Sequence, residues 1–154
     1  KPPNEPGRIS AFADSSWADV IPSRKSTYGY YLFVNNAAFS WRAALASILA
    51  LSTAEAELIS ICACATEIAY ARKLANKLGF LQVNPTILYE DNQGAKALAE
   101  HTHFKGRSKH YQLRWSFVQD YVQRHMLVIH YCPREHQLAA AQQQDSEGCL
   151  LPVP

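Results

Sequence analysis

The chain has 154 residues, of which 48% are hydrophobic, and its formal net charge is +2 at pH 7. This length and composition indicate one globular domain with a core of its own and exclude a disordered chain. No apolar run approaches the roughly 18 residues that a membrane-spanning helix needs, and no segment has the pattern of a signal peptide, so we expect no membrane partner.

The composition of the two ends sets the expected domain boundaries. Residues 1–8 are rich in proline and are predicted to be a linker, which suggests a piece of a longer protein. Residues 9–143 carry the periodic patterns of a folded domain. Residues 144–154 lack such a pattern and are predicted to be a disordered tail.

The spacing of the cysteines does not predict a metal site, but their use indicates a reducing cellular compartment. Cys62, Cys64, Cys132 and Cys149 have no zinc-site spacing and no histidine partner at finger spacing. We interpret them as ordinary buried or free thiols. Such thiols fit a reducing compartment, so we expect an intracellular protein, in the cytoplasm or the nucleus.

Strand patterns come first along the chain. Residues 9–14, 28–34 and 38–41 are short runs rich in apolar and aromatic side chains, which predicts three strands. Asn35 and Asn36 are a turn signal between the second and third runs. The three strands should therefore form an antiparallel meander.

A long helix is predicted to follow, from about Thr53 to Leu78. Ser52 is a suitable N-cap, and Glu55 three residues later completes a capping box. Gly79 supplies the signal that ends the helix.

The remaining chain alternates between strands and helices. We predict a strand at 86–89, a short helix from 91–92 to about 100, a helix from 107 to about 125, a strand at 127–131 and a last helix at about 135–143. Strand–helix–strand connections require crossovers, and crossovers give parallel pairing. The order β-β-β-α-β-α-α-β-α therefore predicts an α/β fold with a mixed sheet.

Three acidic residues stand out on these elements. Asp14 ends the first predicted strand and Asp91 follows the fourth, and each of them could simply cap a turn or a helix. Glu57 is different, because it shares a helical stripe with Ile61 and Cys64 and so faces the core. A charge in that position is costly unless it is neutralised or binds a cation.

The predicted sheet brings these acids together. If the first and fourth strands lie side by side and parallel, Asp14 and Asp91 lie at neighbouring carboxyl ends, where sites form in α/β sheets. The long helix brings Glu57 to the same edge, whereas Glu55 lies about 200° round the helix and takes the capping role. Three hard oxygen ligands suit Mg²⁺ or Mn²⁺.

Positive charge gathers in a later stretch. Lys105, Arg107, Lys109, Arg114 and Arg124 lie close together in the sequence, with Asp120 as the one acid among them. A basic element in a near-neutral domain can be an anion-binding surface or an ordinary solvated helix face. The charge pattern by itself leaves both readings open.

Four motifs stand in a characteristic order between about residues 9 and 141. They are residues 13–18 with 24–30, residues 39–41 leading to 50–57, residues 89–95, and residues 107–110 with the helix after them. The strings Leu-Ser-Thr-Ala-Glu-Ala-Glu, at 51–57, and Asp-Asn-Gln, at 91–93, are the most specific. In this order and spacing the chain resembles the ribonuclease H domain of a Ty1/copia-type retrotransposon polyprotein.

The resemblance implies a ribonuclease H-like fold, a five-stranded mixed sheet in the order 3-2-1-4-5 flanked by helices. It also implies hydrolysis of the RNA strand of an RNA–DNA hybrid by divalent ions, Mg²⁺ or Mn²⁺, held by carboxylates that Asp14, Glu57 and Asp91 match by position. Contacts to the hybrid backbone would come from Asn92, Gln93, Arg107, Lys109, His110 and Arg114. Other domains of a polyprotein are further expected partners, and the oligomeric state stays open.

Two departures from the family pattern bear on activity. Where the family has Gln-Leu-Ala-Asp, this chain reads Gln-Leu-Ala-Ala, so Ala140 stands in the place of a fourth acid that helps hold the metal. After Trp41, an apolar segment at 43–49 replaces a basic one, which weakens an expected backbone contact. That segment is either ordinary packing or a partner surface. His130 or His136 could replace the missing ligand, but imidazole is a poorer ligand for Mg²⁺ than carboxylate.

Two functions therefore stay open. The first is a metal-dependent ribonuclease H domain, impaired by the loss of the fourth carboxylate. The second is a catalytically inactive, domesticated or engineered module that serves as a nucleic-acid- or protein-binding scaffold. Ala140 and the lost basic segment favour the scaffold, whereas the three acids and the helix with Lys109 and His110 favour the enzyme.

Overall fold

The computed structural model describes residues 7–20, 23–100, 109–133 and 135–136. Eight elements follow one another: β1 (Ile9–Val20), β2 (Lys25–Val34), β3 (Ala37–Leu45), α1 (Thr53–Lys77), β4 (Thr86–Glu90), α2 (Gln93–Glu100), α3 (Lys109–Gln123) and β5 (Leu127–Tyr131). Their order and type agree with the prediction up to β5. The last predicted helix falls almost entirely outside the described residues.

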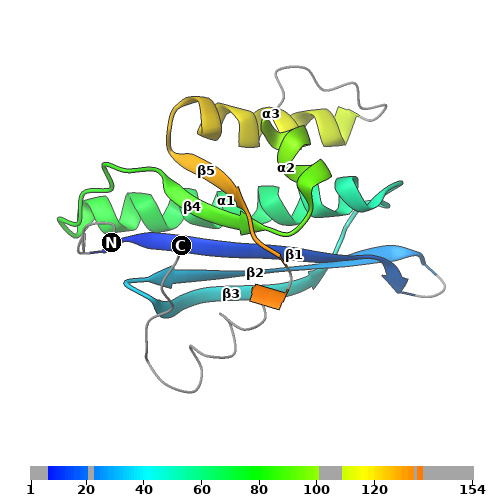
Figure 1. Ribbon diagram of the computed structural model, residues 1–154, viewed down its shortest axis with the longest axis horizontal. Helices are drawn as coiled ribbons and strands as arrows, with labels where there is room; N and C mark the ends of the chain where they lie inside the picture. Colours follow the sequence, from blue (N-terminus) through cyan, green and yellow to red (C-terminus); the bar gives the residue numbers. More distant parts are fainter. Residues whose placement is uncertain (1–6, 21–22, 101–108, 134, 137–154) are drawn as a thin grey trace.

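The strands form one five-stranded sheet in the order β3-β2-β1-β4-β5. Pairing is antiparallel from β1 to β2 and from β2 to β3, and parallel from β1 to β4 and from β4 to β5. The predicted α/β fold with a mixed sheet is therefore confirmed, including the order 3-2-1-4-5. Figure 1 shows α1 lying behind the strands, with α3 packed against it on the side of β5.

The turn between β2 and β3 explains why the meander forms. Asn35 and Asn36 have φ angles of 51° and 67°, the left-handed values that a tight hairpin turn requires and that asparagine tolerates. The Asn35 side-chain oxygen also accepts the backbone N–H groups of Gly7 and Arg8, at 3.0 and 3.2 Å. The same residue thus closes the hairpin and holds the start of β1.

Helix α1 begins and packs as its sequence predicts. The Ser52 hydroxyl accepts the N–H of Glu55 at 3.2 Å, and the Glu55 carboxylate accepts the N–H of Leu51 at 2.7 Å. The apolar members of its inner stripe are fully buried against the sheet. The core on this side consists of Ala11, Ala13, Leu32, Ile61, Cys64, Ile68, Leu88, Val118 and Ile129, among others. None of the helices that the structure describes is long and apolar enough to cross a membrane.

Near its other end α1 is tied to the loop before β4. The Arg72 guanidinium donates to the carbonyl oxygens of Gln82 and Asn84, at 2.7 and 2.8 Å, and to the Thr86 hydroxyl at 3.0 Å. Arg72 and Thr86 are both buried. These bonds fix the position at which β4 starts. They thereby also set the position of its C-terminal end, which Asp91 follows.

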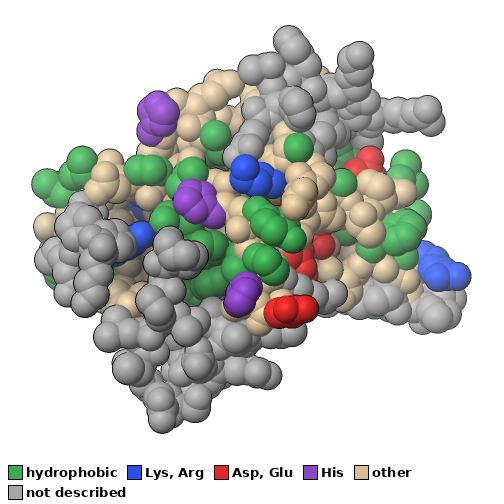
Figure 2. Space-filling view, viewed as in Figure 1, with side chains coloured by type: hydrophobic (Ala, Val, Ile, Leu, Met, Phe, Trp, Pro, Cys, Tyr) green, Lys and Arg blue, Asp and Glu red, His purple; other side chains and the backbone are tan. Residues whose placement is uncertain are grey.

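The opposite face of the sheet carries a row of aromatic rings, one from each strand. The strand register pairs Trp41 with Tyr31, Tyr31 with Phe12, Phe12 with Tyr89, and Tyr89 with His130. Phe12 stacks on Tyr89 with 4.8 Å between ring centroids, and His130 meets Tyr89 edge-on at 6.2 Å. Figure 2, drawn from this side, shows hydrophobic side chains and histidines across the middle of the face. The ring of His130 therefore packs within this row.

Candidate metal centre

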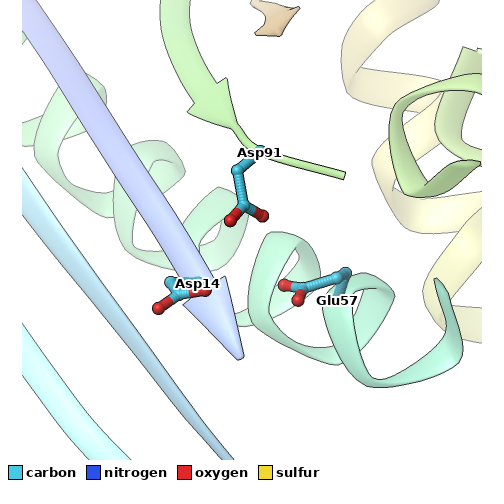
Figure 3. Close-up of side chains that lie close together, drawn as sticks. All are labelled: Asp14, Glu57 and Asp91. Atoms are coloured by element: carbon cyan, nitrogen blue, oxygen red, sulfur yellow. The ribbon is translucent and has the colours of Figure 1, made fainter. Parts of the chain in front are cut away.

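Three carboxylates meet just beyond the point where the parallel pairing of β1 and β4 ends. Asp14 lies within β1, Glu57 lies near the start of α1, and Asp91 directly follows β4. One oxygen of each lies within 4.8 Å of the oxygens of the other two, and Figure 3 shows Glu57 and Asp91 directed toward the part of β1 that carries Asp14. The structure thus brings together the three acids that the sequence singled out, while their catalytic role stays a prediction.

The backbone around Asp14 leaves room for this meeting. Gly29 is the partner of Asp14 in the neighbouring strand β2, so no side chain stands beside the carboxylate there. The buried Ser60 hydroxyl lies 2.9 Å from the carbonyl oxygens of both Asp14 and Gly29. Since Ser60 comes three residues after Glu57, this bond holds α1 at the depth that places Glu57 beside Asp14.

Asp91 is positioned by its two neighbours. The carbonyl oxygen of Glu90 accepts the N–H of Cys132 at 2.8 Å, and its carboxyl oxygen accepts the N–H of Asn92 at 3.1 Å. Asn92 caps α2, because its side-chain oxygen accepts the N–H of Ala95 at 3.0 Å. The capping alternative considered for Asp91 is thus taken by Asn92, and Asp91 projects toward the other acids.

The three acids make a strongly anionic spot. Two unit charges 4.8 Å apart repel by about 3 kcal/mol at an effective dielectric constant of about 20. Glu57 is only 6% exposed, so water screens it poorly. A bound cation would relieve this repulsion, and hard carboxylate oxygens are the donors that Mg²⁺ and Mn²⁺ prefer. Oxygens bound to one Mg²⁺ lie about 3 to 4 Å apart, so small side-chain rotations would complete the fit.

Glu90 is a further acid at this site that the sequence analysis missed. It is fully buried, its second carboxyl oxygen has no hydrogen-bond partner among the described residues, and burial raises the pKa of its carboxyl group to about 10. The negative charge of Glu57 adds to this rise. One signal could have revealed it: Thr86, Leu88 and Glu90 alternate along β4, so Glu90 had to face the core.

An open pocket of about 670 Å³ adjoins the carboxylates. Its lining residues are Ser15, Ser16, Trp17, Thr53, Glu57, Asp91, Asn92, Gln93 and Gly94. Two of the predicted nucleic-acid contacts, Asn92 and Gln93, are therefore at the pocket. The structure does not place Lys109, His110 or Arg114 in its lining: Lys109 and His110 are exposed at the start of α3, and Arg114 is half-buried.

The remaining candidate residues do not join the group. His130 and His136 are both described, and neither belongs to the set of possible metal ligands that Asp14, Glu57 and Asp91 form. Arg107 and Ala140 lie outside the described residues. Cys62, Cys64 and Cys132 are free thiols, as expected from their spacing.

The segment at 43–49 has a mixed character. Ala46 and Ile48 pack, together with Ala50, in a second small core with Tyr111. Leu45 and Leu49 are 49% and 48% exposed. Part of the segment is thus ordinary packing, and part presents apolar surface.

Known proteins resemble this chain in both sequence and structure. No family model matches it. It is 29% identical over 131 residues to the retrovirus-related Pol polyprotein from transposon RE2 of Arabidopsis thaliana, a match that covers 85% of this chain. It is likewise 29% identical over 121 residues, 79% of this chain, to the retrovirus-related Pol polyprotein from transposon TNT 1-94 of Nicotiana tabacum. The chain spans only 9% of the length of each of these relatives.

Solved structures identify the fold. The crystal structure of LC11 ribonuclease H1 in complex with an RNA/DNA hybrid superimposes with a TM-score of 0.60. That match covers 88% of this chain and 92% of the other, at 12% sequence identity, which shows the fold alone. The family resemblance read from the motifs is thus confirmed: the chain is similar in sequence to retrovirus-related Pol polyproteins of transposons, and it has a ribonuclease H-like fold.

Proposed function

We propose that this domain hydrolyses the RNA strand of RNA–DNA hybrids with the help of Mg²⁺ or Mn²⁺, at a rate reduced by the absence of a fourth carboxylate at Ala140. The observation that carries the proposal is the meeting of Asp14, Glu57 and Asp91 within 4.8 Å, just beyond the point where the parallel pairing of β1 and β4 ends in a ribonuclease H-like sheet. The LC11 enzyme, whose fold this chain shares, is crystallised with an RNA/DNA hybrid, which supports the choice of substrate.

Each group at the site has a defined task in this reaction. Divalent ions, when bound, polarise the scissile phosphate and lower the pKa of an attacking water. Asp14, Glu57 and Asp91 would hold such ions through their carboxylate oxygens. Asn92 and Gln93 hydrogen-bond to sugar and phosphate groups at the pocket. Arg107, Lys109 and Arg114 supply positive charge for the rest of the backbone, and the His110 side chain supplies a hydrogen-bonding group beside them.

The substitution Ala140→Asp tests this function. It restores a ligand for the ion that activates water, so we expect hybrid cleavage to rise by about 10- to 1,000-fold, equivalent to roughly 1.4 to 4 kcal/mol of barrier. The measurement is cleavage of a hybrid labelled on its RNA strand, in Mg²⁺ and in Mn²⁺. Ala141→Asp is the matched control, because it adds the same charge one residue away and should not restore the ligand.

Two results would oppose the proposal. Equal and rapid cutting by the unmodified chain and by Ala140→Asp would show that the fourth acid is not needed. If neither form cuts or binds the hybrid, the assignment to nucleic acid itself is wrong.

A second function, a binding module without catalysis, is favoured by the half-exposed Leu45 and Leu49, which replace an expected basic contact with apolar surface. The partner would be another domain of a Pol polyprotein. Two results would support this binding function. The Ala140→Asp variant would bind the hybrid without cutting it, and the variants Leu45→Ser and Leu49→Ser would associate more weakly with such a domain.

A further inference from the structure

The pocket beside the carboxylates has one aromatic wall. Of its described lining residues, Trp17 is the aromatic one, and all the others are serine, threonine, amide, acid or glycine. The Trp17 side chain is 49% exposed. Other large hydrophobic side chains in the described part of the chain, Trp41 among them, are more exposed, so exposure alone does not distinguish Trp17. Its position in the lining of a polar, anionic pocket does.

The ring is held in place rather than left to rotate. The Trp17 indole N–H donates to the carbonyl oxygen of Ala50 at 3.1 Å. The next residue, Ala18, has a φ of 52°, and its N–H donates to the hydroxyl of the buried Ser26 at 3.1 Å. The Ser26 carbonyl oxygen in turn accepts the N–H of Ala46 at 2.8 Å. Hydrogen bonds to other parts of the fold therefore hold both the indole ring of Trp17 and the backbone directly after it.

The loop that accepts the indole N–H is itself anchored on both sides of Ala50. The Tyr111 hydroxyl of α3 donates to the carbonyl oxygen of Leu49 at 3.0 Å. The N–H of Leu51 is bonded to the Glu55 carboxylate of α1 at 2.7 Å. Since its single N–H is already used, Trp17 presents only apolar ring surface to a ligand.

We propose that Trp17 is a nucleic-acid contact, whose ring packs against the sugar face of a nucleotide next to the carboxylates. This inference rests on the proposed function. The polar lining residues can bind phosphates and hydroxyls but cannot cover an apolar face, and Trp17 lies where it can. In A-form-like duplexes the sugars are displayed in a wide, shallow minor groove, which such a ring can reach. A contact of this kind is independent of sequence and of charge.

The test measures binding of a labelled RNA–DNA hybrid in Ca²⁺, by fluorescence anisotropy, over a series of salt concentrations. We expect Trp17→Ala to weaken binding by about 10- to 100-fold, the range seen when an aromatic contact is truncated. The slope of log Kd against log salt should stay unchanged, because no phosphate contact is lost. Arg114→Ala should instead reduce that slope by about one. Trp41→Ala is the matched control, because Trp41 is 67% exposed on β3 and should not affect binding.

A spectroscopic measurement guards against a folding defect in Trp17→Ala. The chain has three tryptophans, so in the double variant Trp41→Phe/Trp115→Phe the emission comes from Trp17 alone. Saturating hybrid should shift or quench that emission, and unchanged emission would overturn the proposal.

The outcomes separate this inference from the function on which it rests. If the unmodified chain binds hybrid and Trp17→Ala binds equally well, the contact is wrong and the proposed function stands. If Trp17→Ala changes the salt slope, its effect arises from charge and the contact is also wrong. If the unmodified chain does not bind hybrid, both fail.

Discussion

Asp14→Asn, introduced into a chain that carries Ala140→Asp, is expected to lower the rate of hybrid cleavage by at least about 10³-fold, because charge stabilisation by a bound metal contributes several kcal/mol. The amide keeps the size of the side chain but removes the charge that attracts the cation. The fold should survive, since the change relieves repulsion from Glu57 and Asp91 in the metal-free protein. Initial rates and the thermal midpoint without metal, measured side by side, check both parts.

Helix α1 offers a matched pair of controls for this prediction. Glu57→Gln should lower the rate as Asp14→Asn does, because Glu57 belongs to the group of converging oxygens. Glu55→Gln should leave the rate nearly unchanged, because Glu55 accepts the N–H of Leu51 and an amide oxygen can do the same. The reverse pattern, with Glu55 essential and Glu57 dispensable, would mean that the helix ligand has been assigned wrongly.

Glu90→Gln is expected to stabilise the metal-free protein at neutral pH. The folded-state pKa of Glu90 is raised from 4.5 to about 10, so the folded chain holds a proton that the unfolded chain releases. Stability therefore falls as the pH rises through this window. One pKa unit corresponds to about 1.4 kcal/mol, so by pH 7 the loss reaches about 3 kcal/mol. Because glutamine cannot ionise, the free energy of unfolding of Glu90→Gln should not fall with pH for this reason.

Urea unfolding at pH 5, 7 and 9 in the presence of a chelator would measure this difference. The unmodified chain should lose stability with rising pH relative to Glu90→Gln, and the gap should widen from pH 5 to pH 9. Asp120→Asn is the control, because Asp120 is an exposed carboxylate paired with Arg124 on the surface. Parallel pH profiles for the unmodified chain and Glu90→Gln would contradict the buried, protonated state of Glu90.

The elements that the sequence predicted best are those set by local signals. The long helix was expected from about Thr53 to Leu78 and runs Thr53–Lys77, because Ser52 caps it and Gly79 follows it with a φ of 89°. Strand β5 has the predicted bounds. Strand β1 was predicted to end at Asp14 but continues to Val20. Its last six residues mix polar and apolar side chains without alternation, and they pair with β2 through an irregular register, which local patterns do not reveal.

Within the candidate site, too, the residues set by local signals could be predicted, and those set by long-range contacts could not. Asp14, Glu57 and Asp91 could be predicted because each stands at an element end or on a core-facing stripe. Trp17 could not, because its placement depends on a bond to Ala50, 33 residues away. The domain boundaries and the effect of Ala140 depend on residues outside the described part of the chain, and they stay predictions.

The most direct test of the three-carboxylate site is a calorimetric titration of the unmodified chain with Mn²⁺ and Mg²⁺, repeated with Asp14→Asn. We expect one tightly bound ion per chain, held by Asp14, Glu57 and Asp91, and loss of that ion in Asp14→Asn. Two ions bound with equal affinity would contradict the assigned role of the missing fourth acid. No binding to the unmodified chain, or unchanged binding to Asp14→Asn, would contradict the metal site itself.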